Sequence, residues 1–272
     1  MFTVSLVTYG QRTEDLLPLI DAVLGEGPDR FFVIDHSPRP SGCAGLAARY
    51  PGIAYVPEDN RGFGAGHNVA LREAQRAGAD FHIIVNPDVS FVTGTIRRIV
   101  AHMASNPRIG LLMPKTLNPD GSLQYNCKLL PTPLDLFGRR FLPKAWMRRR
   151  METFELHAVD PDCERRVPYL CGCFLAFRLE ALREIGLFDE RFFMYPEDID
   201  ISRRMYASRF ESVCWPGAEV THAHAAASYR NLRMLGVHCW NVVKYFNKWG
   251  WFLDAGRRRI NREVLRELQE AS

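Results

Sequence analysis

The 272-residue sequence has few features of a membrane-spanning, disulfide-rich or nucleic-acid-binding protein. No stretch approaches the roughly 20 consecutive apolar residues that a membrane-spanning helix needs. The seven cysteines are odd in number and irregularly spaced, so they do not predict a disulfide framework. The formal net charge of +4 is too small to indicate nucleic-acid binding. We find no internal repeat and no low-complexity segment.

A secretory signal is also lacking. Met1–Val7 goes directly into a strand-like run, without a basic lead or a small-residue cleavage site. Cys171 and Cys173 lack the two-residue gap of zinc or redox pairs, so we interpret both as buried small hydrophobic residues. We therefore expect a cytoplasmic protein, either soluble or peripheral on the inner face of the cell membrane.

The hydrophobic fraction of 47% is ordinary for a globular protein, and a chain of this length can bury a full core. Helix-like stretches at Thr13–Leu24 and Gly64–Ala77 lie between short apolar runs that read as strands. This alternation predicts a parallel sheet covered by helices. The strand-like runs are Phe2–Thr8, Arg30–Ile34, Ile53–Pro57 and Phe81–Val85.

Polar or glycine-rich residues follow each of these four strands. Ligands of such sheets bind beyond the carboxyl ends of the strands, where these residues would gather. The four places are Thr8-Tyr9, Asp35, the loop Asn60–Asn68, and Asn86-Pro87-Asp88.

The middle of the chain, from Pro114 to Val167, predicts an irregular excursion over the ligand-binding face. A second ordered block follows it. We expect strands at Tyr169–Phe177 and Glu219–His222, helices at Leu179–Ile185 and Asp200–Ser208, and a largely helical tail at Leu232–Leu268.

Asp88 follows a buried strand, where a carboxylate could hold Mg²⁺ together with substrate phosphates. Asn-Pro-Asp is also good turn material, and taken alone we favour the turn. In the loop before Asn68, three glycines at alternate positions would let the backbone approach an anionic ligand at a helix N-terminus. A simple turn would need only one glycine, which favours the ligand-binding interpretation.

Glu197, Asp198 and Asp200 place three carboxylates within four residues. One of them could act as a general base, or all could form an acidic helix N-terminus. Asp198 could point into the cleft while Glu197 opens the helix. His222 and His224 could complete a metal site with Asp88, although histidines are more often structural, and the odds are about even.

Taken together, these residues resemble the inverting family-2 glycosyltransferases of the GT-A fold, and more narrowly the bacterial rhamnosyltransferase-like branch of O-antigen and surface-polysaccharide synthesis. The match runs in order over most of the chain. It rests on Val4–Tyr9, Val33–Asp35, Asn60–Asn68, Asn86–Val89, Cys171–Phe174, Gly186–Glu190, Phe193–Asp200 with Arg204, His222 with Ser228, and Tyr245–Lys248.

The resemblance implies an α/β fold with a Rossmann-like, mostly parallel sheet flanked by helices. Residues 1–228 would form the catalytic domain, with 1–113 as its nucleotide-binding half and 168–228 as its acceptor half. Residues 229–272 would be a helical C-terminal segment. The implied roles are Asp198 as catalytic base; Thr8, Tyr9, Asp35, Arg61, Gly62, Asn68 and Asn86 in donor nucleotide binding; Gly172, Asp189, Glu190, Glu197 and Arg204 around the sugar and acceptor; and Asp88 and His222, with His224 as a further candidate, as metal ligands.

The implied cofactor is Mg²⁺ or Mn²⁺, and the implied donor is a nucleotide sugar, with dTDP-rhamnose favoured over a UDP-hexose. The acceptor would be a saccharide or an undecaprenyl-diphosphate-linked saccharide. Whether the protein forms a homo-oligomer is left open, and no nucleic-acid partner is expected. The sequence departs from the pattern at Asn86, which replaces a carboxylate, and at His36, where the family more often has Asn.

The tail mixes Tyr245, Phe246, Trp249, Trp251 and Phe252 with Lys and Arg. This mixture is typical of an interfacial helix on an anionic bilayer, which we favour slightly over a helix packed on the catalytic domain. The basic run from Arg139 to Arg150 could help. A nucleotidyltransferase fits poorly, because Thr8–Arg12 is no glycine-rich basic loop. A non-catalytic carbohydrate-binding protein is disfavoured by the retention of Asp88, Asp198 and His222.

Overall fold

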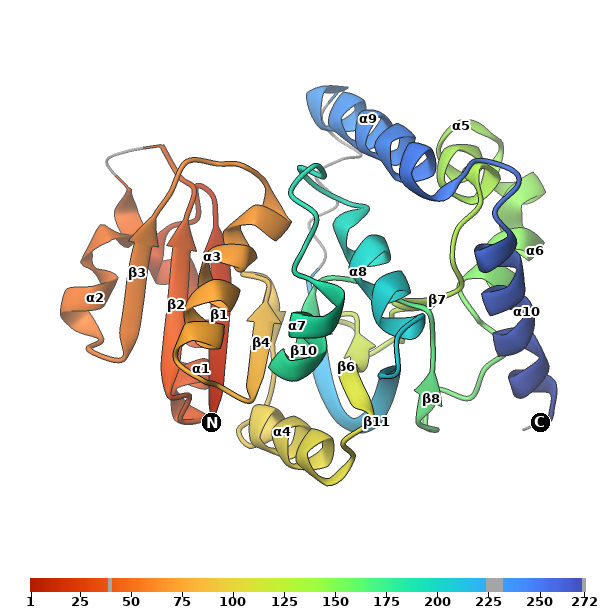
Figure 1. The fold of residues 1–272 in the computed structure, drawn as a ribbon. Coiled ribbons are helices and arrows are strands. Elements are labelled where there is room, and N and C mark those ends of the chain that lie inside the picture. Colours follow the sequence, from red (N-terminus) through yellow and green to blue (C-terminus); the bar gives the residue numbers. More distant parts are fainter. Residues whose placement is uncertain (39–40, 224–231, 271–272) are drawn as a thin grey trace.

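A computed structural model of the chain describes residues 1–38, 41–223 and 232–270. A nine-stranded sheet runs through the molecule in the order β3-β2-β1-β4-β10-β6-β11-β5, with β8 paired to β11 (Figure 1). A separate two-stranded sheet joins β7 and β9. The strands are β1 Phe2–Thr8, β2 Arg30–Asp35, β3 Ile53–Pro57, β4 Phe81–Val85, β5 Val89–Ser90, β6 Ile109–Leu117, β7 Cys127–Lys128, β8 Arg165–Arg166, β9 Tyr169–Leu170, β10 Phe174–Arg178 and β11 Glu211–His222.

The large sheet is mixed but mostly parallel. Strands β1, β2, β3 and β4 are parallel neighbours, and β6 and β11 form another parallel pair. Only β10 and the short strands β5 and β8 run the opposite way. The predicted α/β class is therefore confirmed, and the carboxyl ends of six strands meet at one edge of the sheet.

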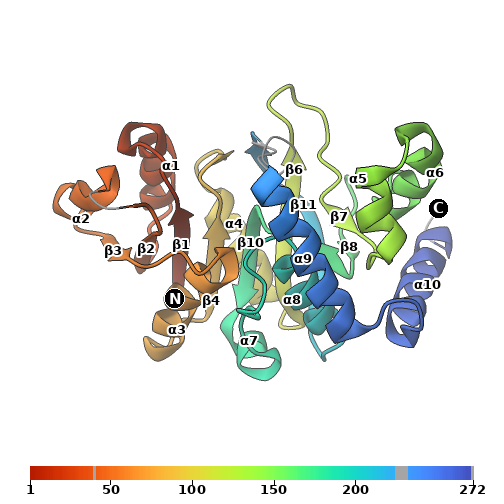
Figure 2. The same ribbon diagram turned by 90° about the horizontal axis from the view of Figure 1, so that it is seen from above.

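Helices cover both faces of the sheet and enclose a core on each (Figures 1 and 2). In β4, Ile83 packs on one side with Leu16 and Ile99, whereas Ile84 packs on the other with Leu71, as the alternation of a strand requires. The helices are α1 Thr13–Gly25, the 3₁₀ turn Gly42–Gly45, α2 Leu46–Arg49, α3 Phe63–Arg76, α4 Thr95–Ser105, the π-helix Leu134–Gly138, α5 Arg139–Phe141, α6 Lys144–Phe154, α7 Leu179–Ile185, α8 Glu197–Tyr206, α9 Leu232–Trp249 and α10 Ala255–Glu270.

The first four strands and α7 lie where the sequence predicts them, but the second half differs in three ways. The expected strand Tyr169–Phe177 is broken at residues 171–173, where the backbone leaves β9 and enters β10. Helix α8 begins three residues early, at Glu197, and the last strand begins at Glu211 rather than Glu219. The middle is not irregular, since it contains β6, β7, the π-helix, α5, α6 and β8.

The C-terminal tail packs on the rest of the molecule. Tyr245 and Phe246 are fully buried in the core that also contains Ile201 of α8. Arg203 of α8 makes a buried bidentate ion pair with Asp254, with both N–O distances below 3 Å. The prediction that the tail aromatics face a bilayer is therefore wrong for Tyr245 and Phe246. None of the described helices is long and apolar enough to cross a membrane.

Candidate functional site

Asp88 and His222 lie together, although 134 positions separate them in the numbered sequence. The turn Asn86-Pro87-Asp88 leads from β4 into β5, and β5 pairs with the end of β11 so that Val89 lies opposite His222. His222 Nε2 is 3.3 Å from Asp88 Oδ1, and Ala223 N–H donates to the carbonyl of Asp88. The structure thus brings together two of the predicted metal ligands, whereas His224 lies outside the described residues.

Gln124 orients the ring of His222. Its Nε2 donates to the carbonyl of His222 and to Asn118 Oδ1, both at 2.8 Å, which fixes the direction of the amide. Its Oε1 then accepts from His222 Nδ1 at 2.9 Å and from Asn126 at 2.9 Å. Because Nδ1 donates, a neutral His222 carries its lone pair on Nε2, the atom that faces Asp88.

The donor set at this point suits a divalent cation. Metal ions are commonly bound by a carboxylate together with an imidazole whose other ring nitrogen, here Nδ1, donates a hydrogen bond to a neighbouring side chain. No group of three or more His, Cys, Asp or Glu side chains suited to a metal occurs within residues 1–38, 41–223 and 232–270. Asp88 and His222 would therefore supply part of the ligand set of a divalent cation.

Asp198 lies in the first turn of α8 and is nearly buried. Its Oδ2 accepts from Gly172 N–H at 3.0 Å, and its Oδ1 accepts from the N–H of Ile199 at 2.8 Å. A β-carbon on Gly172 would lie 3.4 Å from the side chains of both Asp198 and Phe63, so this position has little room for a larger residue. Gly172, predicted to lie near the sugar and acceptor, is thus in contact with Asp198, the predicted base.

Burial raises the pKa of both Asp198 and its neighbour Glu197 well above the ordinary carboxyl range. Hydrogen bonds from Gly172 and Ile199 partly offset this effect at Asp198. At Glu197 the charge of Asp198 raises the pKa further, and Oε2 has no hydrogen-bond partner. The pair therefore holds a proton more tightly than two ordinary carboxyl groups, and the two backbone N–H groups favour the ionised form of Asp198.

The segment Cys171–Cys173 connects the metal-ligand turn to Asp198. The carbonyl of Cys173 accepts from Asn86 N–H at 2.9 Å, and the adjacent Gly172 donates to Asp198. Cys171 N–H donates to the carbonyl of Asn126, the residue that also donates to Gln124. The turn that carries Asp88 and the helix end that carries Asp198 are thus both hydrogen-bonded to residues 171–173, where the expected strand is broken.

Asp35, at the end of β2, is also buried but is closely surrounded by donors. Its Oδ1 accepts from Thr8 Oγ1 at 3.1 Å and from Ser37 N–H at 2.9 Å, and its Oδ2 accepts from Ser41 and from Tyr55 OH at 2.8 Å. Burial alone would raise the pKa of Asp35, but these hydrogen bonds lower it to about 2. Tyr9, the other residue expected here, is well exposed on the following loop.

The three glycines Gly62, Gly64 and Gly66, at the N-cap and in the first turn of α3, pack closely on neighbouring parts of the chain. A β-carbon on Gly62, which has a φ of 105°, would come within 2.1 Å of the carbonyl oxygen of Phe193. Gly64 packs on Phe188, and Gly66 packs on Val7 and on His36. Close packing alone therefore accounts for all three glycines, and it gives a reason for His36. A role of Gly62 in donor binding stays a prediction.

Asn68 and Glu190 hold the same two segments together. Asn68 Nδ2 donates to the carbonyl of Phe188 at 2.9 Å and to Glu190 Oε1 at 3.0 Å, while Asn68 Oδ1 accepts from Phe188 N–H. Glu190 is also paired with Arg72, and Arg61 lies 3.7 Å from it. These contacts place Arg61, Asn68 and Glu190 in one network beside the predicted site.

Asp189 and Arg204 make structural contacts of a similar kind. Arg204 donates to three successive carbonyls, those of residues 185–187, and pairs with the buried Asp200 at 2.9 Å. Lys248 of α9 bridges Asp189 and Asp200 at 2.8 and 2.6 Å. Arg204 therefore fixes the loop before Asp189, and its role around the sugar and acceptor stays a prediction.

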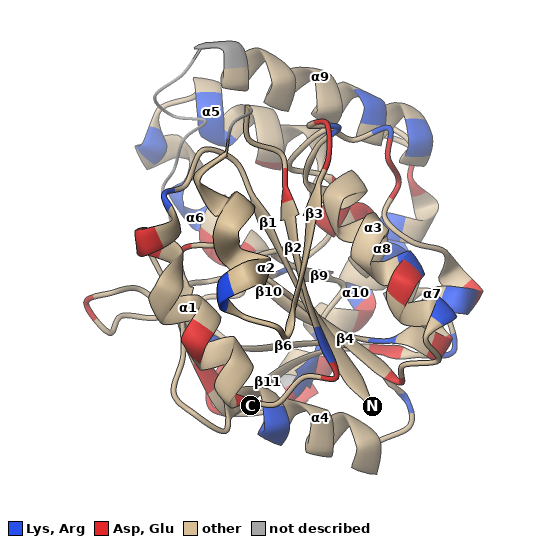
Figure 3. Cartoon of the chain, turned by 90° about the vertical axis from the view of Figure 1, so that its left-hand side faces the viewer, with Lys and Arg blue, Asp and Glu red and all other residues tan. Residues whose placement is uncertain are grey.

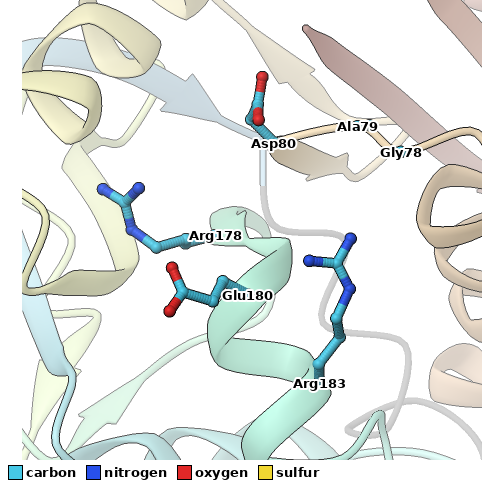
Figure 4. A pocket seen from close by; sticks show the side chains of 6 residues that line it. All are labelled: Gly78, Ala79, Asp80, Arg178, Glu180 and Arg183. Carbon is cyan, nitrogen blue, oxygen red and sulfur yellow. The ribbon is translucent and has the colours of Figure 1, made fainter.

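A cavity of about 280 Å³ lies at the other end of the strands (Figure 4). It is bordered by Asp80, just before β4, and by Arg178, the last residue of β10. Arg178 already donates to the carbonyls of Met103, Asn106 and Ile109. This cavity is remote from Asp88 and Asp198. Its residue Arg178 is already engaged with backbone carbonyls, so it has a structural role.

Sequence reasoning missed Gln124, Asn126 and Lys128. The positive charge of Lys128 acts on Asp198, and Lys128 pairs with Glu155 at 2.8 Å. The chain turns at Asn118–Gly121, where Gly121 N–H donates to the carbonyl of Asn118, but nothing in the sequence connects Gln124 to a histidine 98 positions away. Only the pairing of the strands shows that the residues after this turn support the site.

No family model matches the chain. Two relatives from strains of Mycobacterium tuberculosis, each named N-acetylglucosaminyl-diphospho-decaprenol L-rhamnosyltransferase, are 33% identical over 193 residues. The aligned part covers 67% of this chain and 62% of the relatives, so the chain spans less than two thirds of their length.

Solved structures show the same fold at low sequence identity. S. aureus TarS matches 97% of this chain and 42% of its own, with a TM-score of 0.59 and 15% identity. GalNAc-T7, solved with UDP, GalNAc and Mn²⁺, matches 82% of this chain and 43% of its own, with a TM-score of 0.58 and 16% identity. The mannosyltransferase PcManGT from Pyrobaculum calidifontis was solved with GDP-Man and Mn²⁺. It matches 100% of this chain and 75% of its own, with a TM-score of 0.56 and 16% identity.

The chain thus has the GT-A fold of glycosyltransferases. Its sequence is related to that of a rhamnosyltransferase, which confirms the resemblance to the rhamnosyltransferase-like branch of family 2.

Proposed function

We propose that this protein is a metal-dependent, inverting glycosyltransferase of cell-surface polysaccharide synthesis. The donor would be a nucleotide sugar, which we take to be dTDP-rhamnose because the relatives' name gives L-rhamnose as the sugar they transfer. The acceptor would be a saccharide carried on a lipid diphosphate. The observation that carries the proposal is the meeting of the Asp88–His222 pair and Asp198 at residues 171–173. This arrangement offers a cation site and a buried base side by side.

In the proposed site, Asp88 and His222 hold the cation and Gln124 keeps His222 Nε2 directed at it. A bound Mg²⁺ or Mn²⁺ would neutralise the negative charge that develops on the departing diphosphate. Thr8, Tyr9 and Asn86, at the ends of β1 and β4, would contact the nucleoside part of the donor. Asp35 would accept a hydrogen bond from the nucleobase of the donor. One of the four hydrogen bonds that it now accepts from protein groups would then have to break.

Asp198 would take the proton of the acceptor hydroxyl. As the oxygen forms its bond to the anomeric carbon, the bond from that carbon to the diphosphate breaks, and the proton ends on Asp198. Attack from the face opposite the leaving group inverts the configuration. The raised pKa of Asp198 suits this task, because a base works best when its pKa is near the working pH.

Donor binding and cation dependence can be tested together by a thermal-shift panel of dTDP-rhamnose and UDP-hexoses, each with Mg²⁺, Mn²⁺ or EDTA. We expect stabilisation by one donor only when a cation is present. Transfer measured as release of the nucleoside diphosphate should stop in EDTA and return with excess Mn²⁺. Full transfer in EDTA would remove the cation from the mechanism.

A UDP-hexose donor is the second candidate. It is favoured by the fold of GalNAc-T7, which was solved with UDP, and few substitutions change the preference of a donor pocket. The same panel separates the two donors.

A further inference from the structure

A basic and aromatic segment, residues 139–149, forms an exposed part of the surface. It covers α5 and the first half of α6. Six consecutive residues, 141–146, are exposed, and among them Phe141 is 60% and Trp146 78% exposed. Large aromatic side chains in such a position indicate a surface that meets a partner.

The charge of this segment has one sign. Residues 139–150 include Arg139, Arg140, Lys144 and the run Arg148–Arg150, and they contain no Asp or Glu. Arg150 is paired with Asp135, which fixes α6 to the π-helix. Exposed aromatic residues interleaved with cations are complementary to an anionic surface that also has an apolar interior.

A second exposed apolar element lies beside this segment. The rings of Phe137 and Trp251 stack with centroids 6.3 Å apart, which joins the π-helix to the loop between α9 and α10. In that loop Phe252 is 70% and Leu253 89% exposed. The two elements are therefore parts of one surface.

This surface lies at the end of the molecule toward which the parallel strands point. In Figures 1 and 2, α5 and α9 lie side by side there. Lys and Arg colour α5 and the far end of α9 blue along the upper edge of Figure 3. The surface and the predicted site thus occupy the same end of the protein.

We propose that residues 139–149, together with Phe252 and Leu253, bind the headgroup region of an anionic lipid bilayer. Aromatic rings and aliphatic tips enter the interface while Lys and Arg contact anionic headgroups. An exposed leucine has nothing to offer the phosphates or bases of a nucleic acid, so a bilayer is the better partner. This inference deepens the proposed function, because a lipid-linked acceptor would be met at the same surface.

Co-sedimentation with vesicles tests this surface without donor, acceptor or cation, so its outcome is independent of transfer activity. We expect the full chain to bind phosphatidylglycerol vesicles at low salt, to bind phosphatidylcholine vesicles weakly, and to lose affinity as salt rises. Lys144→Glu/Arg149→Glu should weaken binding at least roughly 10-fold, given a factor of about five for each charge near the surface. Trp146→Ser should also weaken binding but leave most of the salt dependence.

The matched control is Arg98→Glu/Arg183→Glu, on exposed faces of α4 and α7, which changes the net charge by the same amount. It should bind vesicles like the wild type, and all variants should keep the wild-type melting temperature within a few degrees. Equal losses in both double variants, or no loss in Lys144→Glu/Arg149→Glu, would overturn the proposal. Failure to bind vesicles, combined with tight binding to duplex DNA or RNA that these changes abolish, would assign the surface to nucleic acid instead.

Discussion

Asp35 and Asp198 are both buried aspartates at the same edge of the sheet, yet their environments act in opposite directions. Asp35 accepts four hydrogen bonds from its surroundings, and its pKa is about 2. Asp198 accepts two from backbone N–H groups, and burial raises its pKa. At Asp35 the hydrogen bonds outweigh burial and lower the pKa, whereas at Asp198 burial outweighs the two backbone hydrogen bonds and raises it.

The two surroundings suit different tasks. A carboxylate with all its lone pairs occupied serves as a fixed acceptor that organises the loops at the ends of β1, β2 and β3. A carboxylate that is only partly satisfied can exchange a proton near neutral pH. Variants near Asp198 should therefore change turnover, whereas variants near Asp35 should change the stability of the fold.

The largest effect is expected for Asp198→Asn. An amide in this place cannot take a proton, so turnover should fall at least roughly 100-fold, the lower end for a general base. Donor binding should be retained, because Asp198 is assigned no contact with the nucleotide. Initial rates of nucleoside diphosphate release, together with a thermal shift by the donor, separate the two effects.

Asp80→Asn, at the opposite end of β4, is the matched control and should keep wild-type turnover. Wild-type turnover in Asp198→Asn would exclude Asp198 as the base. Loss of donor binding together with turnover would indicate a structural role for this side chain.

A smaller effect is expected for Gln124→Leu. The variant removes the amide that holds His222 in the tautomer with a free Nε2, and loss of such outer partners typically lowers metal affinity about 10- to 100-fold. Mn²⁺ binding in the presence of a nucleoside diphosphate, followed by electron paramagnetic resonance, measures this directly. Gln124→Glu keeps the acceptor for Nδ1 and should recover part of the affinity; equal affinity in Gln124→Leu and wild type would refute the role.

The contrast between the two regions also explains how far the sequence could predict the fold. β1 to β4 are short apolar runs ended by turn residues, so their boundaries are readable. At residues 171–173 the strand is interrupted by a tight turn, in which Cys173 N–H donates to the carbonyl of Cys171, and by hydrogen bonds to Asn86, Asn126 and Asp198 that the sequence does not reveal. Helix α4 and strand β6 carry hydrophobic residues at the right spacing, but neither was assigned.

For the site, residues with distinctive chemistry were easier to find than the residues that support them. Asp88, Asp198 and His222 stood out as carboxylates and an imidazole next to strands or helix ends. Gln124 did not, since its contribution depends on β11 and a turn meeting in three dimensions. The glycines at the start of α3 were given a ligand-binding role because their close packing on Val7, His36, Phe188 and Phe193 has no local signal in the sequence.

Glu197→Gln should stabilise the protein above neutral pH. The pKa of Glu197 is raised to about 8, so the folded state binds its proton more tightly than the unfolded chain does. Stability is then lost as pH rises from about 4, the ordinary pKa, through the raised value. Glutamine cannot ionise, so the stability of the variant relative to the wild type should be higher at pH 8.5 than at pH 5, by at least about 1 kcal/mol.

Urea unfolding at both pH values gives this difference, and Glu73→Gln on the surface of α3 is the control, expected to show no such change. A gain of equal size at pH 5 and pH 8.5 would contradict a raised pKa of Glu197.

The smallest effect, and the opposite pH dependence, is expected for Tyr55→Phe. Removing one of the donors to Asp35 should cost about 1 kcal/mol at pH 7. Because the pKa of Asp35 is lowered to about 2, its hydrogen bonds stabilise the folded state above about pH 4, and that stabilisation disappears as pH falls toward 2. The difference in free energy of unfolding between variant and wild type, measured in urea, should therefore shrink below pH 4. The control Tyr9→Phe, on the exposed loop, should leave the free energy of unfolding unchanged both at pH 7 and below pH 4. A cost that persists unchanged at pH 2 would mean that Tyr55 acts by packing, and that the ionised Asp35 is not what its hydroxyl stabilises.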